Sequence, residues 1–275
     1  MTIVARRRVY WTLFVLALAS LVAFVPLYIG LASGRTPSQF LAKAGALTEY
    51  RFLGLRIPSH ALAAAGIGLC SLFSAMTMGL ILYSFRKTVS TEIFLFAWWV
   101  LSVGFEIIRL IVFRAAAMGG SVYAQALLTR ILLFARYAGY LSLFASGLFA
   151  AGFRSEKLGT IGAVILAVSL GLASAMPINT GAFAPTLDLR PGYAAMNMAF
   201  YAIASVVTVA NFLFAARSTG ESSYRSVAMG AALFLIGHGI VISQWNPAWL
   251  AAGFALLAAG AWIFTSRLHA YYLWQ

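Results

Sequence analysis

Long apolar runs, separated by short polar breaks, constrain this chain more than any other feature of its sequence. A helix needs about 20 apolar residues to cross the hydrocarbon core of a bilayer, and several runs reach that length. Only 9% of the 275 residues are charged, whereas about 25% are charged in a typical soluble domain. Segments of about ten residues with alternating polarity, which a membrane barrel requires, are not evident. The sequence therefore predicts an all-α, polytopic membrane protein.

A bundle of about eight transmembrane helices is expected, forming one integral membrane domain over residues 1–275. The approximate spans are 9–31, 59–83, 92–113, 122–150, 158–176, 193–214, 226–243 and 248–266. The first run follows Arg6, Arg7 and Arg8, as the apolar part of a signal peptide does. It is longer than the roughly 7 to 15 apolar residues of such a peptide, so we expect an uncleaved first helix.

The distribution of basic residues predicts the orientation of the bundle. Eight spans place both termini on the same side. That side carries Arg6, Arg7, Arg8, Arg86, Lys87, Arg154, Lys157, Arg217, Arg225 and Arg267, and the other side carries Arg35, Lys43, Arg51, Arg56, Arg114 and Arg190. Because cytoplasmic loops carry the excess of lysine and arginine, both termini are predicted to be cytoplasmic.

Two connections on the opposite side are long enough to have structure of their own. In the external loop 33–58, Phe40, Leu41, Ala44 and Leu47 recur at helical spacing. This pattern indicates either a short interfacial helix or a solvated loop. Residues 177–192 are rich in proline and glycine, which predicts an irregular external loop.

Small residues recur along one stripe of the last span. They are Ala248, Ala252, Ala255 and Ala259. Since small residues let helix backbones approach closely, we expect this stripe to pack on a neighbouring helix.

The formal net charge of +13 does not indicate a nucleic-acid partner. The basic residues are dispersed among helix ends and loops, which indicates contact with the anionic headgroups of the lipid bilayer. The single cysteine, Cys70, excludes an intrachain disulfide and any multi-cysteine metal site. The three histidines, His60, His238 and His269, lack the spacing of zinc or b-type haem sites, so no metal and no cofactor are expected.

Four charged residues lie inside the third and fourth spans rather than at their ends: Glu106, Arg109, Arg130 and Arg136. A charge near the middle of a bilayer costs at least about 2.5 to 3.5 kcal/mol, so such residues need partners, water or a ligand. Three of the four are arginines. This surplus of positive charge indicates an anionic small molecule or a phospholipid headgroup as the ligand.

Depth along the helices predicts which of these side chains meet. At a rise of about 1.5 Å per residue, Glu106 and Arg130 lie about 10 and 12 Å below the outer ends of adjacent antiparallel spans, so we expect them to form an ion pair. His238 reaches the same level on the seventh span. No catalytic residue is predicted, and the candidate ligand-binding set is Glu106, Arg109, Arg130, Arg136, His238 and Asn197.

Several of these residues also have a purely structural interpretation. A buried pair of Glu106 and Arg130 would fix the register of two helices. Arg109 lies near the end of its span, where its side chain would reach the membrane interface. A lone histidine such as His238 is more often a hydrogen-bonded core residue than part of a site.

Arg136 is harder to explain as structural. It lies deeper than the other arginines and belongs to a polar stripe at helical spacing with Gln125, Thr129 and Tyr140. No acidic residue is within reach along the sequence. Arg136 is therefore expected to bind backbone carbonyls, to extend toward the cytoplasmic interface or to meet an anionic group.

The favoured function is a non-enzymatic module with an outward-facing polar pocket, acting as a sensor or accessory subunit through a membrane or cytoplasmic protein partner. One alternative is a small-solute or proton-coupled transporter in which Glu106 and His238 titrate; another is an outer-leaflet enzyme that acts on lipid headgroups, with one of them as base. In size, eight spans without an effector are similar to bacterial membrane-embedded sensor modules, a likeness of architecture alone. The expected location is the bacterial inner membrane.

Overall fold

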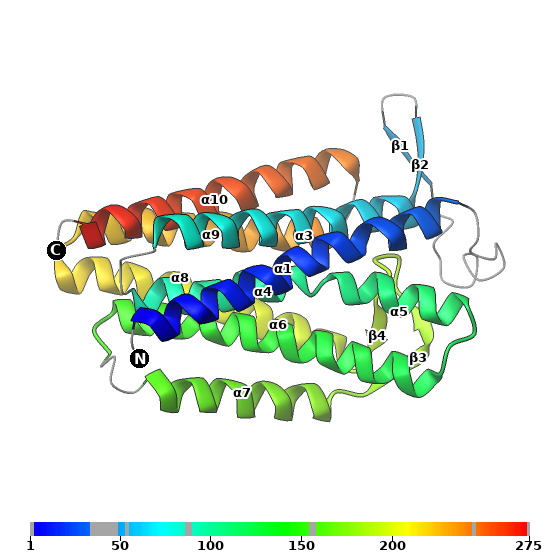
Figure 1. Ribbon diagram of the computed structural model, residues 1–275, viewed down its shortest axis with the longest axis horizontal. Coiled ribbons are helices and arrows are strands. Elements are labelled where there is room, and N and C mark those ends of the chain that lie inside the picture. Colours follow the sequence, from blue (N-terminus) through cyan, green and yellow to red (C-terminus); the bar gives the residue numbers. More distant parts are fainter. Residues whose placement is uncertain are drawn as a thin grey trace.

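The computed structural model describes residues 3–33, 49–52, 55–85, 90–153, 158–243 and 246–273. Within these residues, eight helical segments are long and apolar enough to cross a membrane. They form an all-α bundle along a common axis, with the two termini at the same end (Figure 1). The predicted fold class, a polytopic helical membrane protein, is confirmed.

Helices in the described residues follow the predicted spans, except that the third span is divided in two. They are α1 (Ile3–Ala32), α3 (Ser59–Ser84), α4 (Thr91–Gly104), α5 (Ile107–Ala117), α6 (Val122–Ala150), α7 (Leu158–Ala175), α8 (Ala194–Thr219), α9 (Ser222–Ser243) and α10 (Pro247–Leu273). Several helices outlast their apolar runs: α5 continues past Arg114 and α10 past Arg267. Backbone hydrogen bonds extend a helix whether or not its side chains are apolar, so hydropathy underestimates the length of these helices.

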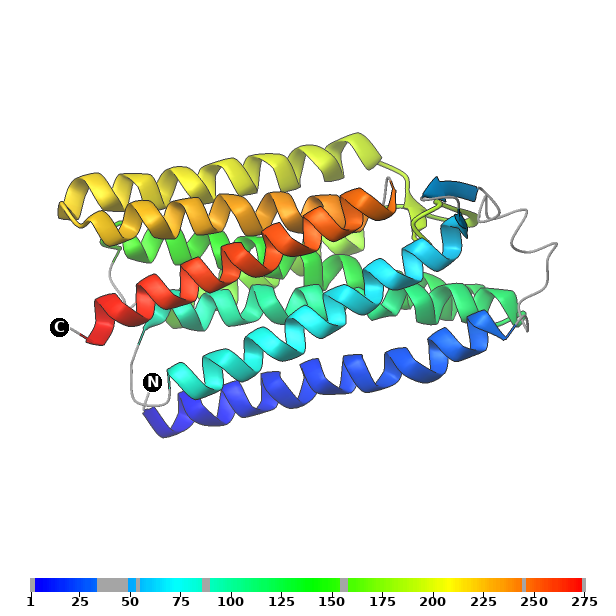
Figure 2. The same cartoon turned by 90° about the horizontal axis from the view of Figure 1, so that it is seen from above.

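The α4–α5 segment lies at the centre of the bundle. In its apolar window 83% of the residues are buried, compared with 17% in α7. Helix α4 packs against α1, α3 and α6, and Figure 2 shows α1 and α8 at opposite edges of the bundle. Charged side chains on α4–α5 are therefore surrounded by protein rather than by lipid.

Aromatic rings dock the α9–α10 hairpin onto α4. Trp99 of α4 is fully buried, and its ring centroid lies 4.5 Å from that of Phe234 on α9. Phe96 of α4 lies 4.6 Å from Phe264 of α10. Such ring pairs contribute about 0.5 to 1.5 kcal/mol beyond their buried area, so they hold α4 firmly in the core.

Helices α9 and α10 approach closely through glycines, not through the predicted alanine stripe. A Cβ on Gly237 would lie 2.4 Å from the backbone nitrogen of Leu257, and a Cβ on Gly260 would lie 2.4 Å from that of Phe234. The stripe residues Ala248, Ala252, Ala255 and Ala259 are all exposed. The prediction that they pack on a neighbouring helix of this chain is wrong, because glycine permits a backbone approach that alanine does not.

Two short β-hairpins lie at the end of the bundle opposite the termini (Figure 1). Strand β1 (Glu49–Phe52) pairs antiparallel with β2 (Leu55–Pro58), and β3 (Ile178–Phe183) pairs with β4 (Leu189–Pro191). The expectation of an irregular loop over 177–192 is therefore wrong, because the residues before and after its turn pair as the antiparallel strands β3 and β4. The segment 40–47, with its helical spacing of apolar residues, lies outside the described residues.

Candidate functional site

The candidate site begins at the break between α4 and α5. Phe105 and Glu106 form a turn there, and the helix tightens locally: Glu106 N donates to Val103 O at 3.3 Å and Arg109 N donates to Glu106 O at 3.1 Å. These bonds span three residues, as in a 3₁₀-helix, and mid-helix stretches of that kind often mark hinges. The break places Glu106 in the core of the bundle, where its side chain has no exposed surface.

Two arginines neutralise the Glu106 carboxylate. Arg136 on α6 donates from Nε to Oε1 at 2.7 Å and from Nη2 to Oε2 at 2.6 Å. Arg109, one turn beyond Glu106, donates from Nη1 to Oε2 at 3.3 Å. The Arg136 contact is a two-pronged ion pair, the strongest geometry available to these groups. It links α6 to the α4–α5 break.

The second acid of the cluster comes from the turn between β3 and β4. Asp188 Oδ1 lies 3.1 Å from Arg109 Nε and 3.4 Å from Arg136 Nη2. The Arg109 Nε–H is not aimed at this oxygen, since within the described residues Nε has no hydrogen-bond partner, so the contact is electrostatic. Asp188 brings the cluster to two positive and two negative charges. We call Glu106, Arg109, Arg136 and Asp188 the four-charge cluster.

The turn that carries Asp188 is anchored by its neighbours. Arg109 Nη2 donates to the backbone oxygen of Thr186. Leu187 is fully buried and has a φ of 65°, a left-handed conformation that is uncommon for a residue other than glycine. It packs with Leu31, Ile67 and Ile107 in a hydrophobic cluster. Burial of Leu187 thus offsets the backbone strain and fixes Asp188 above the arginines.

The predicted ion pair between Glu106 and Arg130 is wrong, because the partner of Glu106 on α6 is Arg136. Arg130 is exposed, and it forms no ion pair with any described residue. At about 100° per residue, Arg130 and Arg136 point about 120° apart around α6. Arg136 lies on the buried face with Gln125, Thr129 and Tyr140, as the polar stripe predicted. The prediction compared only positions along the helix axes and did not consider the direction in which each side chain points around its helix.

His238 and Asn197 lie beside the four-charge cluster but are not part of it. The Tyr140 hydroxyl lies 3.3 Å from His238 Nδ1, and the Tyr137 hydroxyl donates to Asn197 Oδ1 at 2.9 Å. Both tyrosines follow Arg136 on α6. The predicted ligand-binding set is therefore divided. Three of its six residues form the four-charge cluster with Asp188, two are hydrogen-bonded to tyrosines, and Arg130 faces away.

A second buried acid, which the sequence did not single out as a site, lies at the other end of α4. Glu92 Oε2 accepts hydrogen bonds from Ser90 Oγ at 2.9 Å and from the Tyr272 hydroxyl at 2.7 Å. Ser90 caps α4 by accepting from the backbone of Ile93. An acid two residues after a serine is a pattern typical of a helix start, but it does not reveal the bond to Tyr272.

Among the described residues, no group of three or more His, Cys, Asp or Glu side chains is placed to hold a metal ion. Comparison of the chain with protein-family models, with curated proteins and with solved structures gave no match. Any function assigned to the chain therefore comes from the geometry of its own residues.

Proposed function

We propose that this protein is a non-enzymatic module of a bacterial inner membrane that binds a small anion at Arg109 and Arg136 and passes the binding event to a protein partner. The ligand is a carboxylate or a phosphate, free or carried on a lipid headgroup. The excess of basic residues on the side of the termini supports cytoplasmic termini, which makes the β3–β4 end external.

The main support for the proposal is that Asp188 contacts the two arginines only weakly. Its contacts to the two arginines measure 3.1 to 3.5 Å, whereas Glu106 binds Arg136 at 2.6 and 2.7 Å. The Asp188 side chain is 19% exposed and that of Arg136 is 11% exposed, while Glu106 is sealed from solvent. Asp188 thus occupies the position of an exchangeable anion above a permanent ion pair. A ligand carboxylate or phosphate would replace it and leave Leu187 in place.

Helix α4 offers a route by which the displacement reaches the cytoplasmic side. The four-charge cluster lies at one end of α4, at the 3₁₀-type break, and Glu92 lies at the other end. Glu92 binds Tyr272 near the end of α10. A movement of the α4–α5 break would therefore alter the position of the C-terminal helix α10, where a partner would bind. These contacts form a contiguous physical connection between the two ends of α4.

Thermal unfolding of the full chain in detergent tests the proposal, with succinate and inorganic phosphate as probes and sodium chloride at equal ionic strength as reference. Asp188→Asn keeps the size of the side chain and leaves the two arginines facing one acid. We expect this variant to be less stable than the native chain and to be stabilised by either probe. A ligand that binds only the folded state adds about 2.7 kcal/mol at 100 times its Kd.

Two variants of α6 separate site binding from a general salt effect. Arg136→Gln removes the proposed anion site and should abolish the response to both probes in the Asp188→Asn background. Arg130→Gln removes an exposed arginine of the same helix and should leave the response intact. An equal response in both α6 variants, or none with Asp188→Asn alone, would refute anion binding at this cluster.

The break between α4 and α5 favours a transporter as a second candidate. Interrupted helices form the substrate and ion sites of many coupled carriers, and the acid Glu106 lies at such an interruption. Proteoliposomes loaded with a pH-sensitive dye distinguish the two functions. Solute or proton flux that is lost in Glu106→Gln supports transport, whereas anion binding without flux supports the sensor.

A further inference from the structure

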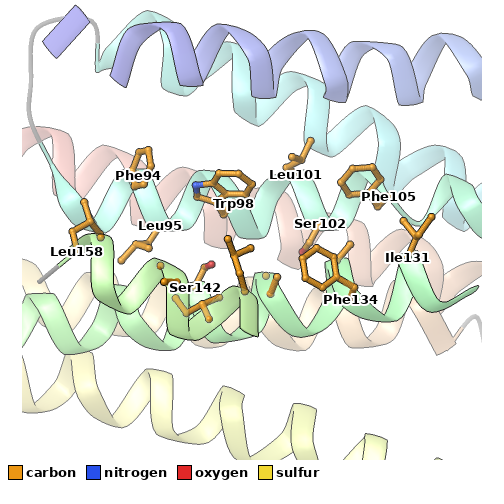
Figure 3. A pocket seen from close by; sticks show the side chains of 18 of the residues that line it. Phe94, Leu95, Trp98, Leu101, Ser102, Phe105, Ile131, Phe134, Ser142 and Leu158 are labelled. Carbon is orange, nitrogen blue, oxygen red and sulfur yellow. The ribbon is translucent and has the colours of Figure 1, made fainter. Parts of the chain in front are cut away.

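A long apolar groove lies between α4, α6 and α7, and no residue of the four-charge cluster lines it. Its volume is about 940 Å³. Figure 3 shows Phe94 and Trp98 of α4 and Phe105 of the α4–α5 break along one side, and Phe134 of α6 on the other side near Phe105. Apart from Arg6, Ser102 and Ser142, its lining consists of aliphatic and aromatic side chains and glycine. Helix α7, which lies at the edge of the bundle (Figure 1), contributes Leu158, Gly162 and Ile165 to the lining of the groove. An apolar groove of this kind at the lipid-facing surface matches a hydrocarbon chain.

The groove has the depth of one lipid leaflet. It runs from Phe94 on α4 to Phe105 in the α4–α5 break, which is about 16 Å at the rise of an α-helix. The hydrocarbon core of a bilayer is about 30 Å thick, so one leaflet accounts for about half. Phe94, Leu158 and Arg6 lie near the N-terminal ends of α4, α7 and α1, which places one end of the groove at the membrane surface nearest the termini.

Arg6 supplies a charge at that end, and it forms no ion pair with an acidic residue in the part of the chain that the structure describes. Its Nε and Nη1 atoms are buried and have no hydrogen-bond partner within the described residues. Its guanidinium carbon lies 5.9 Å from the ring centroid of Phe94, a weak cation–π contact at most. Arg7 and Arg8, by contrast, are exposed. Buried donors without acceptors are costly, so Arg6 calls for an anion at the mouth of the groove.

We propose that the groove holds one acyl chain of an anionic phospholipid, with the lipid phosphate bound by Arg6. This lipid belongs to the leaflet on the side of the termini and is distinct from the anion of the four-charge cluster. A phospholipid supplies both requirements in one molecule, an apolar chain for the groove and a phosphate for the guanidinium. A helix from a partner or a second copy would need an acidic residue at the level of Arg6.

Native mass spectrometry of the full chain tests the proposal, with phosphatidylglycerol and phosphatidylcholine of identical acyl chains as probes. We expect the native chain to retain one phosphatidylglycerol in preference to phosphatidylcholine. Arg6→Gln should weaken phosphatidylglycerol binding about fivefold, the effect of one basic residue near an anionic lipid surface. Arg6→Lys keeps the charge and should restore most of the preference. Arg7→Gln is the matched control and should bind as the native chain does.

A second pair of variants tests the groove itself. A Cβ at Gly162 or Gly171 of α7 meets no atom within 4 Å, so both positions have room for a side chain, but only Gly162 lines the groove. Gly162→Phe should reduce the binding of both lipids, and Gly171→Phe should leave it unchanged. Three results would each overturn the proposal. The first is an equal loss of phosphatidylglycerol binding in Arg6→Gln and Arg7→Gln, and the second is unchanged lipid binding in Gly162→Phe. The third is a dimer whose contact covers Trp98.

Discussion

Removing the buried ion pair between Glu106 and Arg136 provides the sharpest test of the site geometry. Three variants form a double-mutant cycle: Glu106→Gln, Arg136→Gln and the two together. Arg130→Gln is the matched control, because this exposed arginine lies on the same helix as Arg136. Glutamine approximates the size of each side chain while removing its charge. The cycle therefore isolates charge pairing from packing.

The expected energies follow from the contacts of each group. Glu106→Gln leaves two guanidinium groups facing only Asp188, whose contacts are longer, so we expect a loss of about 3 to 5 kcal/mol. Arg136→Gln leaves Glu106 with the single 3.3 Å contact to Arg109, and the loss should fall in the same range. The double variant removes both charges and should cost less than the sum, with a coupling near the upper limit of about 3 kcal/mol. Arg130→Gln should stay within about 0.5 kcal/mol of the native chain.

Reversible unfolding in mixed detergent and denaturing micelles, followed by tryptophan fluorescence, measures all four variants. Buried Trp99 reports on the core beside α4. Additive losses from Glu106→Gln and Arg136→Gln would show that the two side chains are not coupled. A loss from Arg130→Gln as large as that from Arg136→Gln would instead restore Arg130 as the partner of Glu106. Either result would refute the four-charge cluster.

Two further predictions concern the α9–α10 contact and the end of α4 nearest the termini. Gly237→Ala places a methyl group 2.4 Å from the backbone nitrogen of Leu257, and overpacking of this kind costs about 1 to 3 kcal/mol in chemical unfolding. Gly239→Ala, where no atom lies within 4 Å, should instead gain about 0.5 to 1 kcal/mol from helix propensity; a loss there would contradict the structure. Tyr272→Phe keeps the ring but removes the 2.7 Å hydrogen bond to Glu92, and should cost about 1.5 to 3 kcal/mol. Unchanged stability in that variant would mean that Glu92 does not tether the C-terminal helix.

The anion and lipid proposals fail independently of each other. The first depends on Asp188 in the β3–β4 turn and on Arg136 of α6, and the second depends on Arg6 and the groove beside α7. Loss of anion binding in Arg136→Gln should leave lipid retention unchanged. Loss of lipid in Arg6→Gln should likewise leave the succinate response of Asp188→Asn intact.

The sequence by itself determined the class of fold and the number and approximate positions of the spans. Hydropathy depends on the local run of side chains, and a run of about 20 apolar residues has one common solution in a bilayer. The sequence also showed that Glu106, Arg109 and Arg136 are charges inside spans. It placed Arg136 on a polar stripe of α6 that the structure buries.

Only the tertiary structure decided which of these charges meet. The pairing of Glu106 with Arg136 depends on the rotation of α6 about its axis and on the extension of α5 to Ala117, and neither is encoded in hydropathy. The approach of Asp188 depends on a turn folded over the helix ends, with Leu187 buried beneath it. Contacts between segments distant in the chain arise from packing of the whole bundle, so periodicity within one segment does not specify them.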